Sequence, residues 1–122
     1  MARVLRPGDG RGLELAGRTA RELLAGGPEE AGLTVRVVEI APEPPGGPGR
    51  PLHVHRGVGE FVFILAGTGV LIAPGGRETV AAGDAVVVPP DERHKIAPTG
   101  DGPMTVLCVF ACADLAARTD EA

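Results

Sequence analysis

Glycine and proline divide this chain into short apolar runs, and this punctuation limits its possible folds more than any other feature. Nineteen glycines and twelve prolines occur among the 122 residues, between the apolar runs and not in one tract. The runs are rich in β-branched residues, which favour strands. We expect strands near residues 12–15, 19–24, 33–40, 61–65, 70–73, 78–81, 85–88, 94–97 and 104–110, although 19–24 could also be one helical turn. Because no run reads as an amphipathic helix, we predict an antiparallel all-β single domain, a sandwich or barrel.

Charge and composition exclude several classes of partner. The net charge is −4, and the eleven arginines and the single lysine, Lys95, are scattered, so we expect no nucleic-acid partner. No apolar stretch is long enough for a membrane span or a signal peptide, and we expect no membrane partner. Cys108 and Cys112 are too few for a secreted disulfide framework, and we expect them to be buried and reduced. These features predict a cytoplasmic protein.

Residues 41–51 form a proline-rich connection. The sequence APEPPGGPGRP has five prolines and three glycines, so it cannot be a central strand and is expected to be stiff and exposed. It leads directly into His53. It could lie at the rim of a site and restrict entry, or be an inert connector.

Four side chains could hold a metal ion. His53 and His55 are two residues apart, so in a strand they point to the same face. A glycine-rich turn after them can bring Glu60 opposite the pair, and the third histidine, His94, lies far along the chain. Imidazoles and one carboxylate suit a divalent transition metal: manganese, iron, nickel, cobalt, copper or zinc. Taken alone, His53 and His55 are more simply interpreted as solvated residues on an edge strand.

Two spaced motifs resemble those of a known family. The first is a glycine, five residues, His-x-His, four residues, glutamate, six residues and glycine, carried here by Gly47, His53, His55, Glu60 and Gly67. The second runs from Gly83 through Pro89 to His94, with Asp91 where glycine is usual and Pro98 where asparagine is usual. Over residues 33–110 the chain therefore resembles a small single-domain cupin.

This resemblance implies a cupin jelly-roll β-barrel, often paired into a homodimer. It implies that His53, His55, Glu60 and His94 bind one divalent transition metal ion, and neither departure in the second motif removes a ligand. We expect residues 33–112 to form the barrel and residues 1–32 to form strands that pack on it or on a partner subunit. Residues 113–122 are expected to be a C-terminal tail, with at most a helical turn capped by Asp114.

Alternation along the strand that begins at Glu60 predicts the pocket wall. Glu60, Val62 and Ile64 should face inward, which leaves Phe61, Phe63 and Leu65 on the outer face. Either the N-terminal strands of the other sheet or a second subunit could cover this stripe, and we predict a homodimer. Further groups that could face the pocket are Arg36, Glu39, Thr105 and Cys108, and no catalytic residue can be chosen among them.

Open metal positions would favour an enzyme that acts on a small oxygenated metabolite, of the dioxygenase, decarboxylase, lyase or isomerase type. The alternative is a non-catalytic module that binds a metal and a small ligand.

Overall fold

The computed structural model describes residues 2–121, and strands dominate them. In chain order the strands are β1 (Arg11–Leu15), β2 (Arg18–Ala25), β3 (Thr34–Ile40), β4 (Val54–His55), β5 (Glu60–Ala66), β6 (Thr68–Ala73), β7 (Gly76–Ala81), β8 (Ala85–Val88), β9 (Lys95–Pro98), β10 (Met104–Phe110) and β11 (Thr119–Asp120). The helical elements of these residues are three 3₁₀ turns, η1 (Pro7–Asp9), η2 (Pro28–Glu30) and η3 (Leu115–Arg118). The predicted all-β fold is confirmed, and residues 19–24 belong to a strand.

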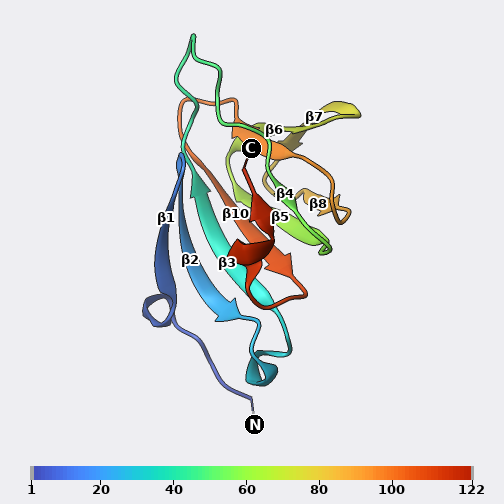
Figure 1. The fold of residues 1–122 in the computed structure, drawn as a ribbon. Helices are drawn as coiled ribbons and strands as arrows, with labels where there is room; N and C mark the ends of the chain where they lie inside the picture. The colour runs from blue at the N-terminus through green and yellow to red at the C-terminus, as the bar shows by residue number, and fades with distance from the viewer. Residues whose placement is uncertain (1, 122) are drawn as a thin grey trace.

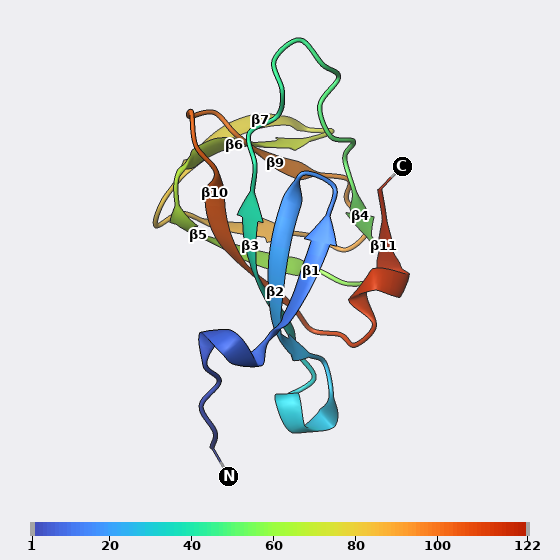
Figure 2. The same ribbon diagram turned by 90° about the vertical axis from the view of Figure 1, so that its left-hand side faces the viewer.

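The strands form two facing layers of an antiparallel barrel (Figures 1 and 2). One layer is a six-stranded sheet in the order β1-β2-β3-β10-β5-β8. The other contains β7-β6-β9 and the pair β11-β4, and a bridge between His53 and His94 joins these two parts. Strands that are neighbours in the large sheet are often distant in sequence: β10, for example, lies between β3 and β5. This order is consistent with a jelly-roll barrel.

Alternation on β5 places its side chains as predicted. Val62 and Ile64 are 2% and 0% exposed and pack in the core with Met104 and Val106 from β10. Phe61 and Leu65, on the other face, are 42% and 45% exposed. The period of two along the strand thus separates the barrel interior from its outer surface.

Two motif glycines and Asp91 lie at turns with positive φ. Gly67 and Gly83 have φ angles of 92° and 94°, which favour glycine. Asp91, where the motif usually has glycine, has a φ of 67°. Its carboxylate accepts a hydrogen bond of 2.9 Å from the backbone N–H of Gly57, and this bond ties the loop before His94 to the loop before Glu60. The departure from the motif therefore keeps the turn and adds a contact.

Both terminal segments join the sheets. Strand β2 pairs with β3 and extends the large sheet, while β11 pairs with β4 beside His55. A helical turn does follow Asp114, which occupies its N-cap position. The Asp114 side chain makes no capping hydrogen bond and its φ is 54°, so the expected side-chain cap is wrong. The last described residues are thus part of the barrel wall next to the metal candidates.

The segment between β3 and β4 contains no strand and projects beyond the barrel in both views (Figures 1 and 2). Lys95 Nζ, which is buried, donates to both carboxylate oxygens of Glu43 at 3.0 and 2.9 Å and to the carbonyl of Arg50 at 2.8 Å. The proline-rich connection is therefore held at two points to the start of β9.

Cys108 and Cys112 are buried and unpaired, as expected. Within residues 2–121, no helix has the length and apolar character needed to cross a bilayer.

Candidate metal centre

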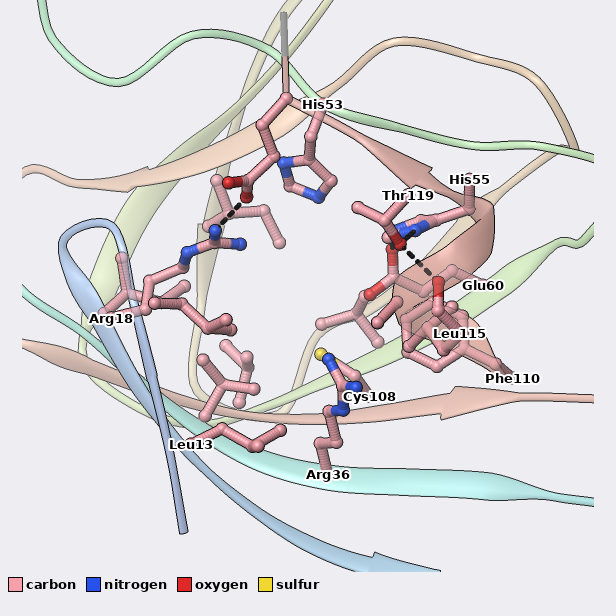
Figure 3. A pocket seen from close by; sticks show the side chains of 18 of the residues that line it. Leu13, Arg18, Arg36, His53, His55, Glu60, Cys108, Phe110, Leu115 and Thr119 are labelled. Carbon is pink, nitrogen blue, oxygen red and sulfur yellow. Dashed lines mark hydrogen bonds and ion pairs between the residues drawn. The ribbon is translucent and has the colours of Figure 1, made fainter. Parts of the chain in front are cut away.

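Strand pairing brings the four predicted ligands together. His53 directly precedes β4, His55 ends it, Glu60 begins β5, and His94 directly precedes β9. The backbones of His53 and His94 exchange two hydrogen bonds of 2.9 Å, which fixes these residues opposite each other. One donor atom from each of the four side chains lies within 4.8 Å of the others. The structure therefore assembles the set named from the sequence, and Figure 3 shows three of its members, His53, His55 and Glu60, around the cavity.

Glu60 lies at the centre of this set. Its Oε1 atom is 2.9 Å from His94 Nε2 and 3.3 Å from His55 Nε2. The ring of His53 lies beside both other imidazoles, with centroid separations of 4.3 Å to His94 and 5.0 Å to His55. All four side chains are buried, so their polar atoms need partners within the protein.

Hydrogen bonds behind the rings determine which nitrogens face inward. Thr119 Oγ1 donates its proton to the carbonyl of Leu115 at 2.8 Å, so it can only accept from His55 Nδ1, 2.9 Å away. Likewise His94 Nδ1 lies 2.9 Å from the carbonyl of Glu92, which can only accept. Both rings thus carry a proton on Nδ1, and a neutral ring presents the lone pair of Nε2 to Glu60.

His55 Nε2 is a buried nitrogen that has no hydrogen-bond partner among the described residues. Its lone pair faces a carboxylate oxygen at 3.3 Å. Two electron-rich atoms repel each other at this distance unless a proton or a metal ion lies between them.

The pKa values reflect the burial and crowding of this site. Burial, with the nearby His94 and His55, lowers the pKa of His53 to about 3. Burial acts to raise the pKa of Glu60, but the imidazoles of His55 and His94 outweigh it and lower that pKa to about 2. Burial acts to lower the pKa of His94, but its contact with Glu60 outweighs this and raises it. At neutral pH the site thus holds an ionised carboxylate and a neutral His53.

A cavity of about 300 Å³ opens beside the four residues. Its surface is mainly apolar, and Figure 3 shows Leu13, Phe110 and Leu115 around it. Of the four further candidates, Arg36 and Cys108 line this cavity. Glu39 and Thr105 line a separate depression and do not. Burial, then the charge of Glu60, raises the pKa of the Cys108 thiol well above its usual value, so it stays protonated at neutral pH.

Several cavity residues were not foreseen from the sequence. Arg18 and Arg50 reach the cavity from the β1–β2 turn and from the proline-rich connection, and Thr119 and Glu121 reach it from the C-terminal segment. No local pattern marks them, because their positions depend on pairings between distant strands.

An antiparallel barrel with three histidines and a glutamate gathered at one cavity defines a class of small barrel proteins with an interior polar site. The Cupin domain family matches residues 41–110, more than half of the chain, and the chain belongs to this family. The resemblance noted in the sequence is thereby confirmed.

A curated relative is the uncharacterized protein MJ1618 of Methanocaldococcus jannaschii, which is 35% identical over 57 residues. This alignment covers 47% of the chain and 46% of the relative, so the chain spans about half the length of the curated relative it matches.

Two solved structures have similar barrels at low identity. The nucleoside dehydratase Pac13 of Streptomyces superposes with a TM-score of 0.76 at 15% identity, covering 100% of this chain and 92% of Pac13. The oxalate decarboxylase of Bacillus subtilis, described with Mn(II) centres, superposes with a TM-score of 0.70 at 21% identity, covering 90% of this chain and 29% of the decarboxylase. At these identities the likeness shows the fold.

Proposed function

We propose that this cupin binds one divalent transition metal ion through His53, His55, Glu60 and His94. The observation that carries the proposal is the buried contact between His55 Nε2 and the Glu60 carboxylate. The hydrogen bond to Thr119 holds a proton on His55 Nδ1, so the Nε2 lone pair of the neutral ring is free to bind a metal ion. A metal ion bound there satisfies this buried lone pair.

The spacing of the donor atoms supports the same proposal. Metal–nitrogen and metal–oxygen bonds are about 2.1 Å long, so donors on opposite sides of an ion lie about 4.2 Å apart. The observed separations of up to 4.8 Å can close to this range through side-chain shifts of a few tenths of an ångström at each donor. Imidazole and carboxylate donors suit manganese, iron, nickel, cobalt, copper and zinc.

We further propose that the protein is a metal-dependent enzyme acting on a small oxygenated metabolite. A bound metal with open positions supplies a Lewis acid that polarises an oxygen of the substrate. The chain itself supplies a cavity of about 300 Å³ with a mainly apolar surface, at the lower end of small-molecule sites. Similar barrels carry out different reactions, so the fold does not choose among dioxygenase, decarboxylase, lyase and isomerase chemistry.

The alternative is a non-catalytic module that binds a metal and a small ligand. One observation favours it: beyond the four ligands, the titratable groups among the described lining residues are arginines, the protonated Cys108 and Glu121. None of these is an evident general base at neutral pH, apart from Glu121, which is paired with Arg18.

Loading the metal-free protein with each of the six metals separates the two functions. Oxygen uptake and product formation would be followed over a panel of 2-oxo acids, diketones, flavonols and uronates. Turnover that is lost in Glu60→Gln supports the enzyme. Metal-dependent ligand binding without turnover of any panel member supports the binding module.

A further inference from the structure

Most of the arginines that line the cavity form ion pairs with acidic residues that do not line it. Arg36 Nε and Arg11 Nη2 share the buried carboxylate of Glu22 at 2.8 and 3.0 Å. Arg50 Nε lies 3.6 Å from a carboxylate oxygen of Glu43. In the described structure, neither Glu22 nor Glu43 lines the cavity. These two glutamates therefore lie behind the cavity surface, and their ion pairs hold the arginine side chains in place.

Arg18 differs, because its acidic partner comes from the cavity lining itself. Its guanidinium pairs with the carboxylate of Glu121, and both residues line the cavity. Figure 3 shows the Arg18 side chain reaching from the β1–β2 side toward His53. The side chain is only 12% exposed, so its charge needs an anionic partner at this position.

The Glu121 carboxylate can be exchanged at low cost. The Glu121 side chain is 38% exposed. In the chain, Glu121 directly follows β11, which is attached to β4 by a pairing of only two residues. Water reaches the Glu121 end of this ion pair and screens it, which limits its net contribution, whereas a planar guanidinium binds any suitably placed carboxylate through two parallel hydrogen bonds. A ligand carboxylate would therefore compete well for Arg18.

A second guanidinium makes this end of the cavity favourable for an anion. The Arg50 side chain lies against the β1–β2 turn, where a Cβ atom on Gly17 would be 2.7 Å from Arg50 Cδ. Burial, then the like charge of Arg18, lowers the pKa of Arg50, as expected for neighbouring cations. Arg50 Nε is buried and makes no hydrogen bond within the described residues. Displacing Glu121 without a replacement would leave the Arg18 charge without its acidic partner and close enough to Arg50 to be repelled by it.

We propose that the ligand of this site is a small organic acid that places a carboxylate on Arg18, where Glu121 now sits, while another of its oxygens faces the metal residues. This inference rests on the proposed metal site and specifies its ligand class. Glu121 then acts as an internal stand-in for the ligand carboxylate, and the C-terminal segment releases Arg18 when the ligand binds. The cavity volume limits the ligand to a few carbon atoms between its two polar ends.

Calorimetric titration of the zinc-loaded protein with malonate, succinate and glutarate tests the assignment. Zinc avoids redox chemistry, and the corresponding diamides serve as neutral controls. We expect at least one dicarboxylate to bind more tightly than its diamide. Glu121→Gln should strengthen that binding about two- to fivefold, because it removes a competitor worth up to about 1 kcal/mol. Arg18→Gln should weaken it at least about tenfold, because hydrogen bonds to charged groups are worth about 1.5–3 kcal/mol.

Matched variants on β7 control for general charge effects. Arg77 and Glu78 are exposed and do not line the cavity, so Arg77→Gln and Glu78→Gln should leave the affinity unchanged. Zinc content would be measured for every variant and should match that of the wild type. If Arg18→Gln does not fold, Glu121→Gln alone decides the question.

The outcomes separate this inference from the proposed function. Wild-type protein that binds no zinc contradicts the metal site itself. Normal zinc content, with dicarboxylate affinities that depend on neither Arg18 nor Glu121, overturns the ligand assignment alone. Inorganic phosphate that binds more tightly than each dicarboxylate, with the same dependence on Arg18, also overturns the carboxylate assignment.

Discussion

A single hydroxyl group sets the direction of the His55 ring. Thr119 accepts the Nδ1 proton of His55 because its own proton is donated to Leu115. Thr119→Val keeps the shape of the side chain but removes this acceptor. We expect metal affinity to fall by about 10–100-fold in a metal titration, as is typical when the group behind a histidine ligand is lost.

Thr119→Ser is the matched control, since it keeps the hydroxyl and should retain nearly full affinity. Equal metal affinity in the valine variant and the wild type would show that Thr119 does not position His55.

The low pKa of His53 predicts how the stability of the metal-free protein depends on pH. An unfolded chain protonates this residue near pH 6.5, but the folded protein keeps it neutral down to about pH 3. Between these values the unfolded state binds more protons, so acidification lowers the free energy of unfolding by up to about 1.4 kcal/mol per pH unit.

Denaturant unfolding at intervals from pH 6.5 to pH 5 measures this slope above the range in which Glu60, whose ordinary pKa is 4.5, begins to contribute. The contribution of His94, whose pKa is raised, is already fully present below pH 6.5. His53→Asn should flatten the slope, and an unchanged slope would assign it to other groups.

The four metal candidates could be named from the sequence because their spacing is itself a local signal. His53 and His55 share a face through strand alternation, and the glycines around Glu60 allow the return turn. Thr119, Arg18 and Glu121 could not be named in this way. Their side chains reach the site only because β11 pairs with β4 and β2 extends the large sheet, and no residue pattern in the sequence encodes those pairings.

The proline-rich connection between β3 and β4 shows how a segment without strands can still be fixed. Lys95 makes three hydrogen bonds to Glu43 and Arg50. Lys95→Met removes all three. Burial acts to raise the pKa of Glu43, but Lys95 and the backbone N–H and charge of Arg50 outweigh it and lower that pKa, so the variant leaves this carboxylate without its main partner. We expect a loss of about 1–3 kcal/mol in the free energy of unfolding.

Hydrogen exchange should also become faster across residues 41–51 in this variant. Arg77→Met is the matched control, because it also replaces a cation by methionine but at an exposed position of β7. It should change neither the free energy of unfolding nor the exchange rate of residues 41–51. Unchanged exchange in Lys95→Met would mean that the prolines alone hold the connection.

Most elements were predictable because a strand is a local pattern of β-branched residues bounded by glycine or proline. Among the strands the exception is β11, which has two residues and too few to show alternation, whereas the strand expected at His53 and His55 is present as the equally short β4. They form only because each supplies the other with hydrogen-bond partners. The C-terminal segment was consequently expected to be a tail, and the proposed boundaries at residues 32 and 112 stay a prediction.

At the scale of the whole molecule, the outer face of the large sheet carries apolar side chains. Phe61 pairs in register with Val87 on β8, and these residues are 42% and 76% exposed. We expect a second copy of the chain to cover this face and form a homodimer. Light scattering at micromolar concentration should give the mass of a dimer.

Phe61→Lys should convert that dimer to a monomer, because it places a charge in the apolar contact. Thr79→Lys adds the same charge on β7, in the other layer, and should leave the dimer intact. A wild-type monomer at micromolar concentration would contradict the expected assembly.

The metal content of the purified protein tests the central claim most directly. Elemental analysis after loading with each candidate metal should find close to one divalent transition-metal ion per chain in the wild type. His53→Ala and His94→Ala should each lose most of it, because each removes a donor from the buried set. A wild type that retains no metal, or histidine variants that retain it stoichiometrically, would contradict the account.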